Sequence, residues 1–244
     1  MAYASEVITG TEAPFAKSLR LLESVRDGSL MSVDTESNGF SARLGARITV
    51  VSMAWRSSDG VGHAIALPFG QGSGGEKIWA PAGAWELVLE KLAMSMLVMF
   101  HSHFDHGMLR AGTMRQPGLD LGAQLHWDGM VAEKIIVGRA TGGLKTTAER
   151  YNLTGGNERD GEEAIEGWLR ARNMDKGDMH KVPWHVMQPY ARTDAVLTLR
   201  LYEEQQTRLL ALSPWVRAQV EAKMSALREK MTLFGQTKSE VLIA

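Results

Sequence analysis

The sequence Leu30-Met31-Ser32-Val33-Asp34-Thr35-Glu36 runs from apolar residues directly into two carboxylates that are separated by one residue. This short apolar stretch follows Gly28 and predicts a β-strand that ends near the carboxylates. Successive side chains of a strand point to opposite faces, so Asp34 and Glu36 share one face and can share a hard cation. An Asp-x-Glu pair at a strand end is also common as a solvated edge or as a helix cap, so the pair alone does not decide its role.

The rest of the chain alternates predicted strands and helices, which indicates an α/β domain. Three further apolar stretches predict strands at residues 47–56, 61–67 and 96–100. Helical spacing of apolar residues predicts helices at 5–29, 81–94, just after 100, and at 147–151, 162–172, 186–210 and 215–234. We expect the helix at 147–151 to begin with a capping box formed by Thr146 and Glu149. Glycine-rich loops at 70–75 and 152–161 are expected to be mobile.

Length and composition bound the architecture and the location of the protein. The 244 residues are enough for one α/β domain that needs no disulfide for stability. We expect residues 1–212 to form the main domain and residues 213–244, which begin with Ser213-Pro214, to form a helical extension packed on it. No apolar stretch approaches the roughly 20 residues that span a bilayer. Polar residues near the N-terminus, Glu6, Thr9 and Glu12, are unlike a signal peptide, so we expect a cytoplasmic protein without a membrane partner.

The absence of cysteine restricts the chemistry that the chain can carry out. Without thiols there are no disulfides, no thiol nucleophiles and no cysteine-based zinc sites, so carboxylates and imidazoles remain as the candidate metal ligands. The formal net charge of −1 provides no general basic field, which argues against tight, sequence-independent binding to long duplexes.

Two further carboxylates stand in positions where they could join Asp34 and Glu36. Tyr190 and Asp194 are four residues apart on a predicted helix, so their side chains lie on one face of it. Asp105 follows the predicted strand at 96–100, at the start of a predicted helical segment. Each has an ordinary alternative, because such spacings are common on helices and a carboxylate near a helix N-terminus interacts favourably with the helix dipole.

Together these segments resemble the three exonuclease motifs of the DEDD superfamily, in the subgroup whose third motif is Tyr-x-x-x-Asp. The order and the spacing of the motifs agree with that family, and the resemblance covers nearly the whole core. The matching segments are Met31-Ser32-Val33-Asp34-Thr35-Glu36-Ser37, Phe104-Asp105-His106-Gly107-Met108-Leu109, and Tyr190-Ala191-Arg192-Thr193-Asp194 with Leu197-Thr198-Leu199. Asp128, the segment at 144–151 and the strand meander are similar to the proofreading domains of family-A DNA polymerases.

The resemblance implies a ribonuclease H-like α/β fold: a mixed five-stranded sheet with helices on both faces. It also implies a 3′-to-5′ exonuclease that hydrolyses single-stranded DNA ends to 5′-mononucleotides with two divalent cations, Mg²⁺ or Mn²⁺. Asp34 would bridge the cations, Glu36 and Asp194 would complete the first site, and Asp105 would hold the second. Tyr190 and Glu36 would orient the attacking water. A role in DNA replication or repair would require a separate DNA polymerase as partner, since residues 215–244 are too short for a polymerase palm.

Five further residues are candidates for substrate binding. Ser37 follows the first motif, and Phe40 stands where the family often places an apolar side chain that wedges between the last bases. His101 occupies a position where the family usually has asparagine. Lys145 and Arg150 are candidates for backbone phosphates. The ordinary alternatives are that Phe40 belongs to the core and that the two basic residues are merely solvated.

Three other functions compete with this interpretation. His101-Ser102-His103-Phe104-Asp105-His106 reproduces the His-x-His-x-Asp-His signature of metallo-β-lactamase-like zinc hydrolases, although the further ligands of that family have no counterpart here and Tyr190 to Asp194 stay unexplained. An RNA-trimming exonuclease of the same superfamily is a closer alternative, because nothing in the three motifs reports on a 2′-hydroxyl. A non-catalytic binding module is the third, and the loss of a carboxylate from the set would indicate it; all four are present.

Overall fold

The computed structural model of the chain describes residues 15–73, 77–138, 142–154 and 158–239. Part of the helix expected at 5–29 and parts of the loops expected at 70–75 and 152–161 lie outside these residues. Among the helices of the described residues, none combines the length and the apolar character needed to cross a membrane.

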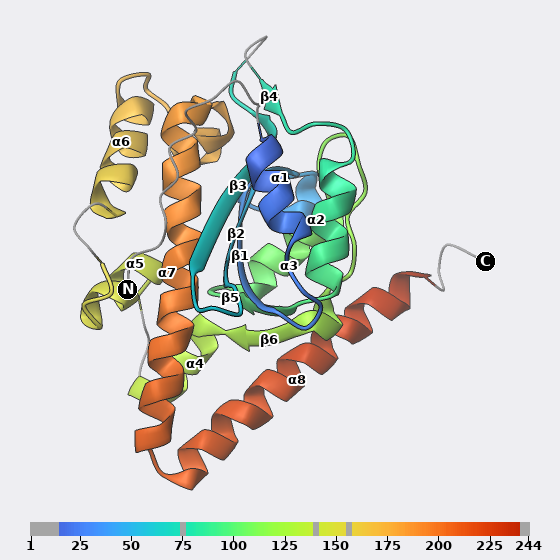
Figure 1. The fold of residues 1–244 in the computed structure, drawn as a ribbon. Helices are drawn as coiled ribbons and strands as arrows, with labels where there is room; N and C mark the ends of the chain where they lie inside the picture. Colours follow the sequence, from blue (N-terminus) through green and yellow to red (C-terminus); the bar gives the residue numbers. More distant parts are fainter. Residues whose placement is uncertain (1–14, 74–76, 139–141, 155–157, 240–244) are drawn as a thin grey trace.

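Six strands form one mixed sheet in the order β4-β3-β2-β1-β5-β6 (Figure 1). The strands are β1 (Leu30–Ser37), β2 (Ile48–Arg56), β3 (Gly62–Gln71), β4 (Ile78–Trp79), β5 (Met96–Met99) and β6 (Leu125–Asp128). β2 is antiparallel to β1 and β3, whereas β5 runs parallel to β1 and β6 runs parallel to β5. The α/β fold class is confirmed, and the sheet exceeds the expected five strands by the two-residue β4 at its edge.

Helices cover both faces of this sheet, as expected (Figure 1). The helices are α1 (Ala16–Glu23), α2 (Ala84–Ala93), α3 (Ser102–Ala111), α4 (Gly129–Val137), α5 (Leu144–Arg150), α6 (Glu158–Arg170), α7 (Trp184–Ala211) and α8 (Pro214–Ser239). The described residues also form three short 3₁₀ segments: η1 (Ala42–Leu44), η3 (Gly122–Gln124) and η4 (Lys176–Lys181). The capping box expected at Thr146 is wrong, because α5 begins earlier, with Gly143 as its N-cap, and Thr146 lies inside the helix.

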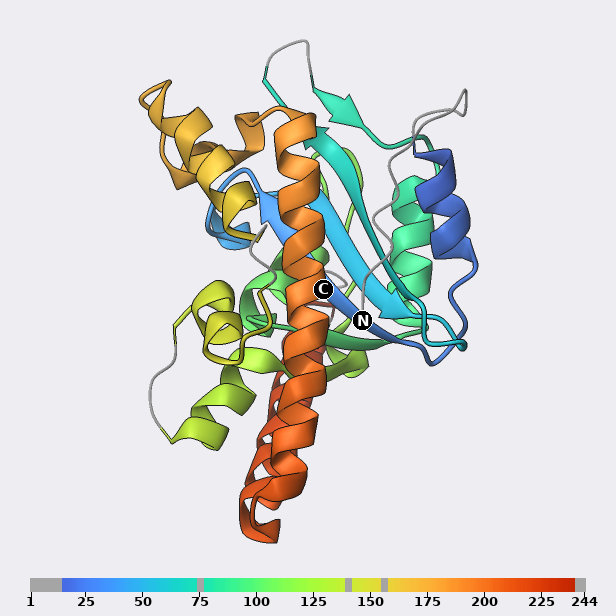
Figure 2. The ribbon, with the colours of Figure 1, turned by 60° about the vertical axis from the view of Figure 1, so that its left-hand side comes forward.

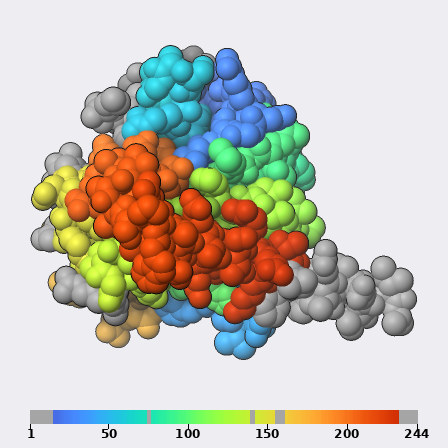
Figure 3. Space-filling view, turned by 90° about the horizontal axis from the view of Figure 1, so that it is seen from below, coloured from blue at the N-terminus to red at the C-terminus, as the bar shows by residue number. Residues whose placement is uncertain are grey.

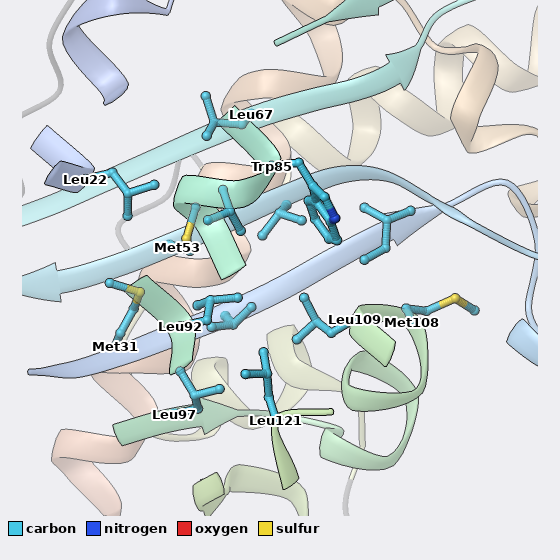
Figure 4. Close-up of a cluster of buried hydrophobic side chains, with 14 of the residues drawn as sticks. Leu22, Met31, Met53, Leu67, Trp85, Leu92, Leu97, Met108, Leu109 and Leu121 are labelled. Atoms are coloured by element: carbon cyan, nitrogen blue, oxygen red, sulfur yellow. The ribbon is translucent and has the colours of Figure 1, made fainter. Parts of the chain in front are cut away.

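One face of the sheet packs against α1, α2 and α3 and forms the main core (Figure 4). Alternate residues of β1 supply this face, so Met31 and Val33 are fully buried in it. Trp85 of α2 and Leu109 of α3 pack over them. Burial of a large apolar side chain stabilises the fold by roughly 1.5–3 kcal/mol, so this core holds β1 rigidly and fixes the positions of the polar residues at its end.

The opposite face packs against α7, which runs the length of the molecule (Figure 2). Small residues allow the close approach: Ala54 of β2 packs against Ala195 of α7 with Leu199 beside it. The buried Ser32 of β1 donates a hydrogen bond to the Ala195 carbonyl at 2.7 Å. This contact fixes the height of α7 along β1, and Ala195 is the residue next to Asp194.

The C-terminal helix α8 lies against η3, β6 and α4 (Figure 3). Val220 and Met224 are buried with Val98 of β5 and Trp127 of β6, and Met231 reaches the main core. Arg228 donates a hydrogen bond to the Leu125 carbonyl. The helical extension expected after residue 212 therefore covers the side of the sheet formed by β6.

Candidate metal centre

Asp34 and Glu36 lie at the end of β1 and face α7. In the register of the sheet they are opposite Ser52 and Val50 of β2, two residues apart on one face. Thr35 between them is buried and points to the other face. The pairing of the two carboxylates on one face, expected from the sequence, is therefore present.

Asp194 of α7 completes a cluster of three carboxylates. One oxygen each of Asp34, Glu36 and Asp194 lie within 4.8 Å of one another. Asp194 is buried, and its Oδ1 accepts no hydrogen bond within the described residues. The Lys145 ammonium lies 3.4 Å from this oxygen without forming a hydrogen bond to it. A single ammonium does not balance three neighbouring carboxylates, so the cluster favours a ligand that supplies further positive charge. A donor set made only of carboxylate oxygens suits a hard divalent cation.

Asp105 lies beside this cluster, on α3, and is held by Thr35. Asp105 Oδ1 accepts a hydrogen bond from the Thr35 amide at 3.1 Å and one from the Thr35 hydroxyl at 2.8 Å. Because Thr35 faces away from α7, the fourth carboxylate approaches the end of β1 from the other side of the sheet. Among the described residues, Asp105 is not one of the three carboxylates whose oxygens lie within 4.8 Å of one another. Burial raises the pKa of Asp105 to about 7, and the two Thr35 hydrogen bonds lower it in part.

Burial and mutual repulsion raise the pKa values of the clustered carboxyls. The pKa of Glu36 is raised to about 8, first by burial and then by the charge of Asp194. Burial, with the charges of Asp105 and Glu36, raises the pKa of Asp34 well above its ordinary value. Even beside the Lys145 ammonium the cluster therefore retains protons at neutral pH, and a divalent cation would replace them.

Tyr190 and Lys145 border the cluster. Tyr190 lies one turn before Asp194 on α7, and burial, followed by the charges of Glu36 and Asp194, raises its pKa well above the ordinary value. The Lys145 ammonium, from α5, lies 3.4 Å from Asp194 Oδ1 and 3.9 Å from the centroid of the Tyr190 ring. Gly161 of α6 lies against Tyr190, where an added Cβ would be 3.5 Å from the Tyr190 Cα.

The other candidate substrate residues differ in their surroundings. Phe40 is 71% exposed, so the alternative that it belongs to the core is wrong, and its ring lies close to Gly177 of η4. Ser37 donates its hydroxyl to the Gly39 carbonyl at 2.6 Å. His101 is exposed at the N-cap of α3 and stacks on Phe104.

Arg150 points into a different polar network. Its guanidinium contacts Glu133 Oε1 at 2.6 Å, and Glu133 is fully buried. The Tyr151 hydroxyl donates to the same oxygen at 2.7 Å, and Gln205 donates to the other at 3.0 Å. A contact between Arg150 and a substrate phosphate would have to compete with this ion pair.

In the part of the chain that the structure describes, the histidines of the segment 101–106 do not gather into a metal site. His106 is buried and pairs with Asp120 at 3.0 Å, and burial lowers its pKa. His101 and His103 are exposed. The group of three potential ligands found among the described residues contains carboxylates alone. The zinc-hydrolase alternative therefore has no ligand set in the described part of the chain.

Three residues around the centre were not singled out by sequence reasoning as site residues. Thr35 holds Asp105, and its place between the two carboxylates is a signal that could have identified it. Glu162 of α6 lies 3.7 Å from Lys145, and no local pattern indicates that contact. Asp128 was noted only as part of the resemblance. One of its carboxylate oxygens accepts from the Ser102 amide and hydroxyl and the other from the Val131 amide, so it joins the starts of α3 and α4.

A mixed sheet with an antiparallel second strand, covered by helices on both faces, is the ribonuclease H-like fold, and comparison with solved structures agrees. The chain is similar to NrnC from Brucella melitensis with bound Mg²⁺, at 18% identity and a TM-score of 0.51 over 84% of this chain and 85% of that one. A second structure of Brucella melitensis NrnC gives 17% and 0.52 over the same shares. The catalytic core of RRP6 from Trypanosoma brucei gives 12% and 0.51 over 87% of this chain and 49% of that one. No protein-family model and no curated protein sequence matches the chain.

Proposed function

We propose that this protein is a metal-dependent 3′-to-5′ exonuclease that hydrolyses single-stranded nucleic acid ends to 5′-mononucleotides, and that it belongs to the tyrosine-bearing subgroup of the DEDD superfamily. The observation that carries the proposal is the convergence of Asp34, Glu36 and Asp194, whose carboxylates each place one oxygen within 4.8 Å of the other two. The shared fold with the Mg²⁺-bound NrnC structure supports it.

The carboxylates would hold two divalent cations, Mg²⁺ or Mn²⁺. Asp34 would bridge both, Glu36 and Asp194 would complete one site, and Asp105 would complete the other through the oxygen that Thr35 leaves free. Two such cations supply charge stabilisation for the attacking and the leaving oxygens of a phosphodiester. Thr35 and Ser32 contribute by fixing Asp105 and α7 at the end of β1.

Tyr190 and Glu36 would orient the attacking water. Because the pKa of Tyr190 is raised well above its ordinary value, the phenol keeps its proton and acts as a hydrogen-bonding group rather than as a base. Its position one turn before Asp194 places the phenol at the edge of the carboxylate cluster.

The exposed side chains near the centre suit an unpaired strand end. Phe40 offers an apolar ring to the last bases, and base stacking on such a ring is worth about 1–3 kcal/mol per base. Ser37 and His101 would contact the same single-stranded nucleic acid. Single-stranded DNA remains the first choice by the resemblance to polymerase proofreading domains, with RNA as the alternative. A separate DNA polymerase as partner is a prediction of the same kind.

Digestion of labelled oligonucleotides tests the proposal. DNA and RNA strands of one sequence, labelled at the 5′ end, should give a ladder that shortens from the 3′ end with Mg²⁺, and the activity should vanish with EDTA. The Asp34→Asn variant serves as the control for a contaminating nuclease. Activity that survives EDTA, or loss of the 5′ label as the first product, would contradict the proposal.

A further inference from the structure

Lys145 brings a positive charge into direct contact with a proposed metal ligand. Its ammonium is 3.4 Å from Asp194 Oδ1 and 3.7 Å from Glu162 Oε2, and it lies over the face of the Tyr190 ring. The side chain is only 15% exposed. These contacts come from α5, α6 and α7, which pack together on one side of the molecule (Figure 2).

Lys145 is the first residue in a series of ion pairs in which lysine and glutamate alternate. Glu162 also lies 3.9 Å from the ammonium of Lys176, and Lys176 lies 3.7 Å from Glu166. Lys176 is also a lysine, and its side chain is 64% exposed, so it lies at the solvent end of the same series of ion pairs. Lys145 therefore differs from its neighbour in one respect that matters here: it touches a carboxylate of the cluster.

An ammonium and a divalent cation compete for the same oxygen. Two positive charges a few ångströms apart repel each other by about 1 kcal/mol in water and by several kcal/mol at the lower effective dielectric of a protein. The lysine ammonium stands on a flexible four-carbon stem, so it can leave Asp194 without a change in the backbone. Under the proposed nuclease function, the anionic group of the substrate that binds beside Asp194 and Tyr190 is a phosphate.

We propose that Lys145 is a displaceable counter-ion that neutralises Asp194 before cation binding and afterwards contacts a non-bridging oxygen of the scissile phosphate. The inference rests on the proposed nuclease function for its second half only. It makes Lys145 a catalytic residue, and it predicts effects of opposite sign on cation affinity and on turnover, which a purely structural role would not produce.

Lys145→Gln tests both halves, with Lys176→Gln as the matched control. Calorimetric titration of Mn²⁺ into the protein without substrate should show binding on the order of tenfold tighter in Lys145→Gln, because a nearby positive charge is gone. With saturating Mn²⁺, kcat on a single-stranded oligonucleotide should fall on the order of tenfold or more, since a phosphate contact is lost. Lys176→Gln should leave both quantities close to those of the wild type.

Lys145→Arg guards against a folding defect, since it keeps the charge. It should retain wild-type Mn²⁺ affinity and recover part of the turnover, with an unchanged melting temperature. Unchanged or weaker Mn²⁺ binding in Lys145→Gln would overturn the counter-ion role, and unchanged kcat would overturn the phosphate contact. If the wild type cleaves no oligonucleotide, the proposed function and the phosphate contact fall together, while the Mn²⁺ titration still decides the counter-ion role.

Discussion

Two buried carboxylate sites lie along α7, and they differ in how their oxygens are satisfied. Glu133 is fully buried, and its two oxygens receive Arg150, the Tyr151 hydroxyl and the Gln205 amide at 2.6–3.0 Å. At the other site, one oxygen each of Asp34, Glu36 and Asp194 lie within 4.8 Å of one another, and a single ammonium, that of Lys145, lies 3.4 Å from Asp194 Oδ1 without a hydrogen bond within the described residues.

The difference separates a structural charge from a functional one. A buried carboxylate whose oxygens all have cationic or hydrogen-bonding partners within the protein needs no further ligand. A cluster of carboxylates that repel one another destabilises the folded chain and is retained where a ligand completes it.

Asp34→Asn should abolish most of the nuclease activity without harming the fold. The variant keeps the size of the side chain but removes the charge that both proposed cations share, so we expect kcat to fall by several orders of magnitude. Without metal, its melting temperature should equal or exceed that of the wild type, because one repelling carboxylate is gone. Single-turnover kinetics and thermal unfolding in EDTA measure the two effects. Near-full activity would remove Asp34 from the centre.

Glu133→Gln should show the reverse pattern. Loss of the charge leaves Arg150 without its partner in a buried network, which lowers the free energy of unfolding by about 3 kcal/mol, at the lower end of the usual range because Arg150 is partly exposed. Folded protein should keep its kcat. Urea unfolding followed by circular dichroism measures the loss. A stable variant with greatly reduced kcat would place this network in the catalytic site instead.

Tyr190→Phe should slow cleavage on the order of a hundredfold, because the phenol is assigned to the attacking water. Cation affinity should change little, since the phenol is not a proposed ligand. Comparison of kcat with the Mn²⁺ binding isotherm separates these effects. Equal kcat in the variant and the wild type would remove the water-orienting role.

Phe40→Ala should have the smallest catalytic effect and should act on binding. The ring is exposed, so its removal leaves stability unchanged, and the loss of base stacking should raise KM roughly tenfold. Single-stranded oligonucleotides of several lengths measure KM directly. An unchanged KM would mean that the exposed ring does not contact the strand end.

Local periodicity in the sequence predicts which carboxylates share a face of one strand or one helix. It does not predict the hydrogen bonds and ion pairs between residues that are far apart in the chain. The alternation of β1 and the four-residue spacing of Tyr190 and Asp194 place these carboxylates correctly, because each pattern depends on a single element. The hydrogen bonds from Thr35 to Asp105 join residues 70 positions apart.

The same limit explains the remaining differences. The sequence gives no sign that Arg150 pairs with Glu133, because that contact depends on how α5 packs beside α4 and α7. It also missed β6, because Leu125–Asp128 lacks the uninterrupted apolar stretch that predicted the equally short β5. α5 begins at Gly143 rather than at the expected capping box, so local side-chain chemistry did not set that boundary.

Thermal unfolding as a function of pH, with and without Mg²⁺, tests most directly whether the carboxylate cluster is a cation site. Folding raises the pKa of Glu36 to about 8 and that of Asp105 to about 7, from ordinary values of 4.5 and 3.8. Between these limits the folded chain binds more protons than the unfolded chain, so stability in EDTA should fall steadily as the pH rises from 5 to 8. Mg²⁺ should restore most of the lost stability at pH 8 in the wild type and much less in Asp34→Asn. A melting temperature that is independent of pH over this range and unaffected by Mg²⁺ would contradict the account.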